Sequence, residues 1–496
     1  MELISDTHVR KIRAFSEPKR RLLEKYLREG AAQSFRGASA IDPRPAGEPA
    51  PLSLSQEQVL LREELVPGIP ALYNESVTIY RFGQLDFEAL KRSLTEVIRR
   101  HEIWRTTYVD SSSGKLQVVH PVPEHMRLPL LDQRAVPADR RAADTVHLLS
   151  GDACSKLDME RGPLVSAHLA RFDEEEFRLY LIVHQSVLDG VSVYQVLLTE
   201  LAALYNAYSQ NKPSPLPELP IQFADYAYWQ RNQFGGEALA RQMEYWREQL
   251  CGELPVLRWP ARRPRPSQQL FRGAIEPFAF SKSLTESLKA LAQRAGSTLF
   301  VSLLSAFAVL LHSYTCQSEL MIGTVSPSGR KRSEVQKLMG YFLNPVPLRF
   351  HLDSVSTFLD LFIHVQNVLG GAMSHDDIPF EHLVKELGLN TDVSRNPCFT
   401  VAASLEPPLA NVGPEWNLTP MDVNSGGARW DLYFVWDDRP TGMIGRVQYN
   451  PDLFEPEEVT SMIADFRYML EIMIEDPTQK ICDLNLDRFA GYTDSF

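Results

Sequence analysis

The sequence predicts an α/β protein that is built from two lobes of similar size. Its 496 residues exceed what one compact core usually serves, so we expect two domains. Short apolar runs that are typical of buried strands alternate with helix-patterned segments in both halves, as they do in α/β domains. A Pro- and Arg-rich stretch at residues 262–269 (RRPRPSQQ) marks a crossover between the halves.

The elements can be placed by their apolar periodicity. Residues 82–100 show helical spacing, and residues 177–183 (FRLYLIV) form the clearest buried strand, followed at once by a second helix pattern. The second half has a long apolar helix at residues 299–314 and strand patterns at residues 320–325 and 345–350. Strands and helices therefore alternate in both predicted lobes.

Four parts are expected along the chain. They are a basic segment with its linker (residues 1–45), an N-terminal lobe (46–225), an inter-lobe connection (226–270) and a C-terminal lobe (271–496). The linker is assigned from its Pro, Gly and Ala content.

Composition excludes several classes of function. The formal net charge of −12 argues against general nucleic-acid binding. No apolar run approaches the roughly 20 residues needed to cross a bilayer, and no signal-peptide core is present, so we expect a cytoplasmic protein. The five scattered cysteines form no CxxC pair, and no metal or nucleotide motif occurs.

The N-terminal segment differs in charge from the rest of the chain. Residues 8–36 carry nine Lys or Arg against three Glu, and Ser16, Pro18 and Gly30 mark the start and end of a short helix. A solubilising extension or a helix packed on the body explains this segment. Alternatively, it docks an acidic partner peptide, because tethered cations raise encounter rates with anionic segments. The cations assigned to docking are Arg10, Lys11, Arg13, Lys19, Arg20 and Arg21.

The string HQSVLDG at residues 184–190 lies at the junction of the predicted strand 177–183 and the helix that follows. Polar side chains at the end of an element can reach a cleft. Alone, the string is a weak signal, because a His at a strand end is more often a hydrogen-bonded core residue. An Asp beside a Gly more often belongs to a turn.

Several further motifs strengthen this signal. Residues 184–190 resemble the HHxxxDG motif of the condensation-domain superfamily of non-ribosomal peptide synthetases. Residues 52–61 (LSLSQEQVLL) resemble its opening motif and are followed by YNES at residues 73–76. Residues 100–108 (RHEIWRTTY) resemble its RHExLRTxF motif, and residues 223–230 (FADYAYWQ) its YxDFAxWQ motif. The series continues in order with residues 322–330, 340–349 (GYFLNPVPLR), 375–384 (HDDIPFEHLV) and 394–397 (SRNP).

The resemblance implies an α/β (α+β) fold of two chloramphenicol-acetyltransferase-like lobes. These lobes would form a V-shaped pseudo-dimer with a tunnel at the interface and residues 184–190 near its middle. It also implies acyl transfer, in which an amine or hydroxyl attacks a thioester held on the phosphopantetheine of a partner acyl or peptidyl carrier protein. No bound cofactor, metal, membrane or nucleic-acid partner is expected, and we expect a monomer.

One position departs from the family motif, because Gln185 stands where the second His is expected. A carboxamide donates and accepts hydrogen bonds but takes up no proton near pH 7. Loss of a general base removes a factor of about 10²–10⁴, whereas proximity and orientation remain available. Three interpretations stay open: condensation by positioning, a non-catalytic module that binds carriers or partners, and an altered version of an active enzyme. An amine acceptor tolerates the loss better than an alcohol.

The remaining site residues follow from the resemblance. His184, Gln185, Asp189 and Gly190 form the predicted catalytic loop, in which His184 supports the loop and Asp189 pairs with Arg330 from the second lobe. Such a pair has an architectural role, because breaking a buried ion pair costs about 3–5 kcal/mol. Gly190 suits a close backbone approach, although a plain turn explains it nearly as well. The tunnel candidates are Ser186, Asn344 and Trp430.

The resemblance thus implies a stand-alone condensation enzyme that transfers a carrier-bound polyketide or peptidyl chain to an amine or hydroxyl acceptor, as in antibiotic biosynthesis. By analogy with free-standing members of the family, the transfer would be a chain-release step. The alternative is a catalytically degenerate module that binds a carrier protein or recruits a partner enzyme. Epimerisation is disfavoured because it also relies on the missing His. The acyl chain, the acceptor and the choice between ester and amide do not follow from the sequence.

Overall fold

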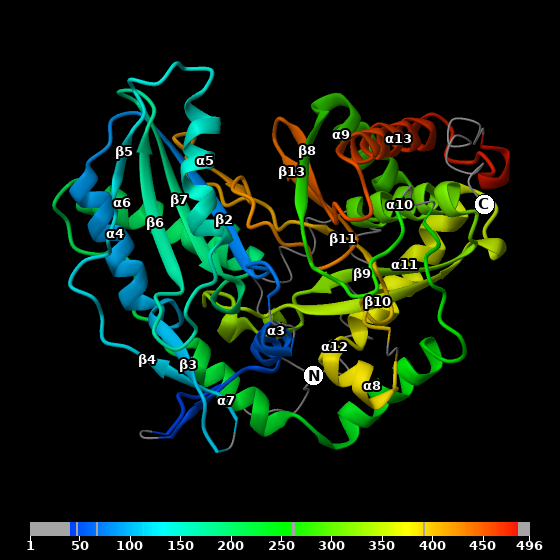
Figure 1. Cartoon of the computed structure of the whole chain (residues 1–496), viewed down its shortest axis with the longest axis horizontal. Helices are drawn as coiled ribbons and strands as arrows, with labels where there is room; N and C mark the ends of the chain where they lie inside the picture. The colour runs from blue at the N-terminus through cyan, green and yellow to red at the C-terminus, as the bar shows by residue number, and fades with distance from the viewer. Residues whose placement is uncertain are drawn as a thin grey trace, which may run out of the picture.

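The computed structural model describes residues 40–45, 48–65, 68–112, 114–259, 263–389 and 392–484. The six cations assigned to docking lie outside these residues. Within them, two lobes stand side by side, each with a central sheet and flanking helices (Figure 1). The prediction of an α/β fold with two lobes is confirmed.

The N-terminal lobe is built on a five-stranded sheet with the order β12-β2-β7-β6-β5. Its strands are β2 (Asn74–Phe82), β5 (Leu130–Asp132), β6 (Val165–Arg171), β7 (Glu176–His184) and β12 (Trp416–Pro420). Its helices include α3 (Leu54–Leu65), α4 (Phe87–Arg100), α5 (Arg141–Cys154) and α6 (Leu198–Tyr208). A small second sheet has the order β1-β4-β3, formed by β1 (Ala50–Pro51), β3 (Thr106–Val109) and β4 (Leu116–Val119).

Strand β7 is buried on both faces, which explains its nearly continuous apolar run. Leu179, Leu181 and Val183 join the large core that contains the apolar faces of α4 and α6. Tyr180 and Ile182 point the other way and pack in a smaller core with residues of α5. The period-2 alternation of a strand therefore serves two separate cores.

The C-terminal lobe is built on a six-stranded sheet with the order β10-β9-β11-β13-β14-β8. Its strands are β8 (Ala274–Ser281), β9 (Glu319–Ser326), β10 (Asn344–His351), β11 (Val401–Leu405), β13 (Leu432–Arg439) and β14 (Gly442–Tyr449). Its helices are α9 (Lys282–Arg294), α10 (Leu299–Thr315), α11 (Phe358–Ser374), α12 (Phe380–Glu386) and α13 (Pro456–Glu475). Helices α7 (Phe223–Gln233) and α8 (Gly236–Gln249) lead from the first lobe toward the second.

Most predicted elements are found where the pattern put them. The strand of residues 177–183 is β7, the apolar helix of residues 299–314 is α10, and the strand patterns of the second half are β9 and β10. The start of the helix predicted at residue 82 is wrong, because residues 74–82 form β2. The helix α4 begins at Phe87, after Asp86 accepts a hydrogen bond from the Ala89 N–H at 2.9 Å.

Two segments of the second half of the sequence enter the first lobe. Strand β12 pairs antiparallel with β2, with Leu418 opposite Ile79, and so extends the N-terminal sheet. The segment that follows β9 also inserts apolar side chains into the N-terminal core. These are Val335, Leu338, Met339 and Phe342. Neither crossing was predicted from the sequence, and both tie the lobes together around the loop of residues 184–190.

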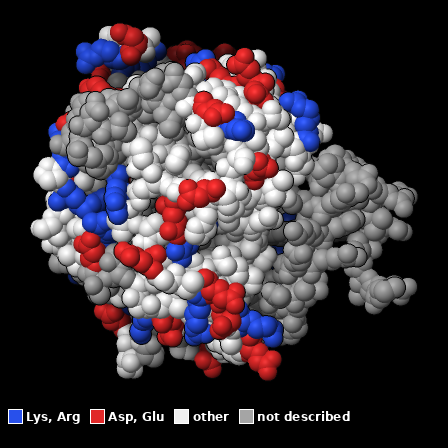
Figure 2. Space-filling view, turned by 90° about the vertical axis from the view of Figure 1, so that its right-hand side faces the viewer, with Lys and Arg blue, Asp and Glu red and all other residues white. Residues whose placement is uncertain are grey.

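Within the described residues, no single helix is long and apolar enough to cross a membrane. Helices α9 and α10 reach the required length and composition only as a pair, and the chain bends by 102° between them. The described residues contain no group of three or more His, Cys, Asp or Glu side chains that could hold a metal ion. On the face shown in Figure 2, acidic and basic side chains are interspersed among uncharged ones.

Three glycines make a testable backbone contact beside β8. The Gly273 N–H donates to the Gly426 carbonyl at 2.8 Å, and a Cβ on Gly273 would lie 2.2 Å from the Gly427 carbonyl carbon. We predict that Gly273→Ala lowers the free energy of unfolding by about 1–3 kcal/mol, because the two backbones must separate. The matched control is Gly370→Ala on α11, where nothing lies within 4 Å of a new Cβ.

Ala is a better helix former than Gly, so Gly370→Ala should leave stability unchanged or raise it by about 0.5–1 kcal/mol. Urea unfolding followed by circular dichroism measures both variants. Equal midpoints for the two variants would contradict the close backbone contact.

Candidate active site at the interface of the two lobes

Strand β7 delivers the loop of residues 184–190 to the interface between the lobes. The strand ends at His184, and residues Gln185–Val187 form one 3-10 turn. The Gln185 N–H donates to the Tyr73 carbonyl at 2.7 Å, which fixes the turn against the start of β2. Residues 184–189 are all buried, so the loop is held inside the protein.

The centre of the interface is an ion pair between Asp189 and Arg330. The Arg330 Nε donates to Asp189 Oδ2 at 2.8 Å and its Nη2 donates to Oδ1 at 2.7 Å, which is a bidentate arrangement. The side chains of Asp189 and Arg330 are 0% and 3% exposed, respectively. Two parallel N–H···O bonds between a guanidinium and a carboxylate give the strongest form of this contact.

Each remaining polar group of this ion pair is also engaged. Arg330 Nη1 donates to the carbonyls of Val335 and Leu338 at 3.2 and 3.1 Å. Asp189 Oδ1 accepts from the Ser192 N–H and hydroxyl, both at 2.8 Å. The guanidinium carbon of Arg330 also lies 4.2 Å from the centre of the Phe342 ring. Full hydrogen bonding offsets the desolvation that a buried ion pair otherwise costs.

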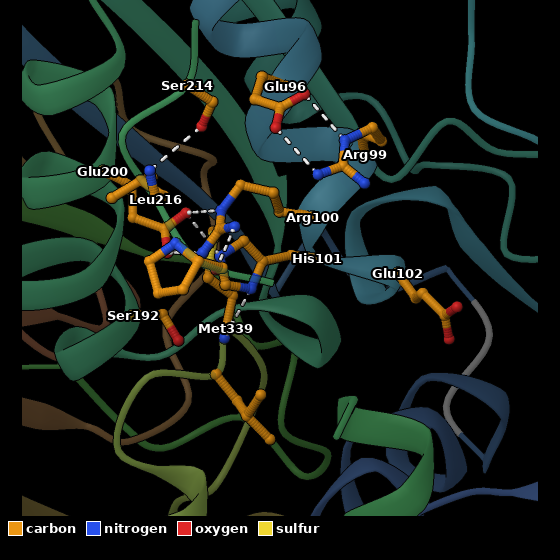
Figure 3. Close-up of polar contacts among 12 residues, drawn as sticks. Glu96, Arg99, Arg100, His101, Glu102, Ser192, Glu200, Ser214, Leu216 and Met339 are labelled. Atoms are coloured by element: carbon orange, nitrogen blue, oxygen red, sulfur yellow. Dashed lines mark hydrogen bonds and ion pairs between the residues drawn. The ribbon is translucent and has the colours of Figure 1, made fainter. Parts of the chain in front are cut away.

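A second buried network joins the N-terminal lobe to the segment that follows β9 (Figure 3). The Arg100 guanidinium donates twice to Glu200, at 3.0 Å for each bond, and His101 Nε2 lies 3.0 Å from Glu200 Oε2. On its other side, His101 Nδ1 accepts from the Met339 N–H at 3.3 Å. Although burial opposes it, the hydrogen bonds from His101 and Arg100 hold the pKa of Glu200 below its ordinary value.

His184 is braced within the loop. Its Nδ1 accepts from the Ser186 N–H at 3.3 Å and lies 2.7 Å from Ser186 Oγ, while Tyr108 donates to the same hydroxyl at 2.9 Å. On the other side of the ring, Nε2 lies 3.3 Å from Glu63 Oε2. Ser186 is 0% exposed. Its assignment to the tunnel stays a prediction.

Gln185 forms a bridge between the two lobes. Its Nε2 donates to Glu75 Oε1 on β2 at 2.7 Å, and its Oε1 accepts from Arg429 Nη1 at 2.9 Å. Arg429 Nη2 lies 3.9 Å from the same Glu75 oxygen. Arg429 follows β12, in the part of the sequence assigned to the C-terminal lobe. The position of the expected catalytic His is therefore occupied by an amide that links a carboxylate to a guanidinium.

The charges around Glu75 come from both lobes. Burial raises the pKa of Glu75, the cations Arg429 and Arg446 oppose this shift, and the acids Glu406 and Asp189 add to it. Arg446 donates to Glu406 at 2.9 Å. The net effect is a raised pKa, so Glu75 is a stronger proton acceptor than an ordinary carboxylate.

Gly190 allows the loop to approach the second lobe. A Cβ at this position would lie 3.1 Å from Glu406 Oε2 and 3.2 Å from Pro407 Cδ. The neighbours closest to this glycine are thus side chains of the C-terminal lobe. The role of Gly190 in the loop stays a prediction.

Two cavities flank this group of residues. The larger has a volume of ≈ 490 Å³ and lies between the sheets of the two lobes, with Tyr80 and Tyr180 on one side and Ile444 and Arg446 on the other. The smaller, of ≈ 30 Å³, is lined by residues that include Tyr73 and Arg429. Residues 184–190 line neither cavity. The two arginines that act on Glu75 therefore each border a different cavity.

The other predicted tunnel residues have defined places. Asn344 is buried and holds the segment before α12, because its Nδ2 donates to the carbonyls of Asp376 and Ile378 at 2.9 and 2.7 Å. Trp430 is buried, lines the smaller cavity and lies edge-on to Tyr433 with 4.8 Å between the ring centres. The tunnel itself and the roles of both residues stay predictions.

Sequence reasoning missed two residues that the structure brings to Gln185. Glu75 lies within the YNES string and received no role, and Arg429 was not singled out. A signal for Glu75 was its place as the one acidic residue of β2. No local pattern marks Arg429, which lies shortly after two glycines.

The fold and this interface define the class of protein. Two lobes joined by an Asp–Arg pair, with the HQSVLDG loop between them, are the arrangement expected of a condensation domain. Residues 47–489 match the Condensation domain family, and the chain belongs to that family.

Named relatives refine this assignment. The chain is similar to chondramide synthase cmdD of Chondromyces crocatus, 37% identical over 93% of this chain and 12% of that protein. It is 33% identical to the phosphinothricin tripeptide synthetase PhsC of Streptomyces viridochromogenes, over 96% of this chain and 44% of that protein. The chain thus spans less than half the length of these curated relatives.

Among solved structures, the chain is similar to the X-domain from teicoplanin biosynthesis. The TM-score is 0.75 with 26% identity, covering 90% of this chain and all of that one. The X-domain in complex with OxyB gives a TM-score of 0.74 with 26% identity, covering 91% of this chain and 98% of that one. These likenesses and the family match agree on the fold.

The ion pair at the interface gives a direct stability prediction. Replacing Arg330 with Ala leaves Asp189 buried and unpaired, so the free energy of unfolding should fall by about 3–5 kcal/mol. The matched control is Arg467→Ala on α13, which removes an exposed pair with Glu471 at 2.8 Å. That change should cost less than about 1 kcal/mol. Denaturant midpoints measure both, and a fully stable Arg330→Ala protein would refute the architectural role.

Proposed function

We propose that the chain transfers an acyl group from a carrier-bound thioester to an amine or hydroxyl acceptor. Membership of the condensation-domain family supports acyl-transfer chemistry. The single observation that carries the proposal is the polar bridge of Glu75, Gln185 and Arg429 at the interface of the lobes. Positioned polar groups at this point can orient an acceptor toward a thioester.

The reaction forms one bond and breaks one bond at the same carbonyl carbon. The acceptor nitrogen or oxygen attacks the thioester carbonyl, the C–S bond breaks, and the carrier thiol leaves. The acceptor proton ends on the sulfur, so no oxidant, metal or nucleotide is needed. In this proposal the acyl chain is held on phosphopantetheine of a partner carrier protein.

The intact frame around the loop supports an active enzyme. Asp189, Arg330 and His184 keep their hydrogen bonds within the loop and its surroundings. The Gln185 amide is also hydrogen-bonded through both its nitrogen and its oxygen. A residue that only filled the space of a lost His would need neither bond. We therefore favour condensation by positioning over an altered enzyme.

A second candidate function rests on the likeness to the X-domain. That domain forms a complex with OxyB, and a domain of the same fold could recruit a partner enzyme to a carrier-bound chain. This alternative predicts no product in a transfer assay. It also predicts retention of a loaded carrier protein on the immobilised chain.

The transfer assay is done by intact-protein mass spectrometry. A carrier protein loaded with an acyl-pantetheine is incubated with the chain and with panels of amines and alcohols. We expect loss of the acyl mass from the carrier and appearance of the acylated acceptor, faster than in the absence of the chain. Unchanged carrier mass with every acceptor would contradict the proposed function and favour recruitment.

The role of Gln185 is tested by Gln185→His. Since the amide bonds to two charged groups, each worth about 1.5–3 kcal/mol, we predict that the variant transfers more slowly by about tenfold or more. The matched control is Gln195→His, an exposed glutamine in the following helical turn, which should keep the wild-type rate. A large gain of rate in Gln185→His would instead show that Gln185 replaces a required base.

A further inference from the structure

We propose that Glu75 is the group that binds the acceptor and takes its proton, and that the acceptor is an amine that arrives as an ammonium ion. This inference rests on the proposed function and deepens it by naming the substrate class and a further catalytic residue. Glu75 lies at the start of β2, beside the end of β7, where it is opposite Val183 in the register of the sheet.

The geometry leaves one side of the carboxylate open. Glu75 Oε1 accepts from Gln185 Nε2 at 2.7 Å, whereas no described residue donates a hydrogen bond to Oε2. The Glu75 side chain keeps 25% of its surface exposed, while its neighbours Gln185 and Asp189 are buried. A partly exposed carboxylate beside a buried loop is suited to a donor that comes from solvent.

The nearby cations do not neutralise Glu75 by a short ion pair. Arg429 lies 3.9 Å away and is engaged with Gln185, and Arg446 is paired with Glu406 at 2.9 Å. The charged groups that act on Glu75 are Arg429, Arg446, Glu406 and Asp189. The charges of two cations and two other acids thus offset one another around Glu75. No described cation lies at short ion-pair distance from its carboxylate, so the carboxylate can bind an incoming ammonium.

The same surroundings favour proton transfer. Burial raises the pKa of Glu75, and transfer into the same site lowers the pKa of an ammonium, because both shifts favour neutral forms. A carboxylate and an amine are thereby brought closer in proton affinity than they are in water. An alcohol has no proton of comparable acidity, so a carboxylate is a poor base for it.

Gln185 then acts as a positioning residue. Its Nε2–H keeps Glu75 Oε1 in place both before and after Oε2 takes a proton, because an amide does not change its own protonation state near pH 7. Arg429 holds the other end of the amide and so fixes which way the amide points. The arrangement transfers the proton-accepting role from residue 185 to the neighbouring strand.

The transfer step conserves protons and electrons. The ammonium passes one proton to Glu75 Oε2, and the neutral nitrogen attacks the thioester carbonyl to form the C–N bond. The second nitrogen proton leaves as the C–S bond breaks, and the carrier thiolate takes up one proton. The products are an amide, a free thiol and one proton that Glu75 returns to solvent.

The test compares Glu75→Gln, Glu75→Asp and the wild type in steady-state transfer to an amine. Glu75→Gln keeps the size of the side chain but removes the base, so kcat/KM should fall by about 10²–10⁴-fold. Wild-type rates should rise with pH as Glu75 loses its proton, and this rising limb of the pH–rate profile should lie at higher pH than for an ordinary carboxylate. In Glu75→Gln the rising limb should be absent. Glu75→Asp should recover part of the rate together with the limb.

The matched control is Glu176→Gln, at the opposite end of the same strand pair. The Glu176 side chain is 29% exposed and is paired with Arg178 at 2.8 Å, so the variant also deletes a partly exposed carboxylate beside an arginine. Its rate and pH profile should match the wild type. Melting temperatures of all variants separate loss of fold from loss of chemistry.

A second experiment tests the same inference with the wild-type protein alone. The alcohol that replaces the acceptor's amine by a hydroxyl should give ester at least about 100-fold more slowly than the amine gives amide. Equal rates for the two acceptors, or a Glu75→Gln enzyme with wild-type rate and pH limb, would overturn the inference while leaving acyl transfer intact. A wild type that acylates no acceptor would overturn the proposed function and this inference together.

Discussion

The buried ion pair between Asp189 and Arg330 holds the two halves of this protein in a fixed relation. It is bidentate, with N···O distances of 2.8 and 2.7 Å, and almost no part of either side chain reaches water. Taken alone, two buried charges destabilise a fold through desolvation. Here the Ser192 hydroxyl and the carbonyls of Val335 and Leu338 engage the remaining donors and acceptors. The pair therefore fixes the loop of one lobe to a segment of the other.

The consequence is a site assembled from three distant parts of the chain. Glu75 is the second residue of strand β2, Gln185 follows the neighbouring strand, and Arg429 comes from the segment between β12 and β13. Only a fixed relation between the lobes brings the amide of Gln185 within 2.7 Å of the carboxylate and 2.9 Å of the guanidinium. The chemistry we propose follows from that geometry, since an amide can orient a base but cannot be one.

Local patterns in the sequence were enough for most of the fold. The apolar run of β7 and the 17-residue helix α10 are long and strongly patterned, so their type and place could be predicted. Arg330 could be assigned only through the family resemblance, because nothing within its own neighbourhood marks it as the partner of Asp189. Strand β12 has five residues, which is too short for a reliable pattern, and it pairs with β2 from the other end of the chain.

The site residues also divide into those that a local sequence pattern identifies and those that it does not. The loop of residues 184–190 was predicted because its motif is contiguous, and the departure at Gln185 is visible within that motif. Glu75 and Arg429 were missed because their importance comes from contacts across the interface, with sequence separations of 110 and 244 residues from Gln185. Charged residues at strand ends and in glycine-rich loops are ordinarily solvated, and only the three-dimensional arrangement distinguishes these two from that common case.

The role of the Asp189–Arg330 pair can be measured as the distance between the lobes when the pair is broken. Spin labels at Leu148→Cys on α5 and Ile363→Cys on α11, positions that are 61% and 63% exposed, report this distance by pulsed electron resonance in a background without native cysteines. We predict one narrow distribution with Arg330 in place and a broadened or shifted one in Arg330→Gln. An unchanged distribution in a folded Arg330→Gln protein would contradict the role given to the ion pair.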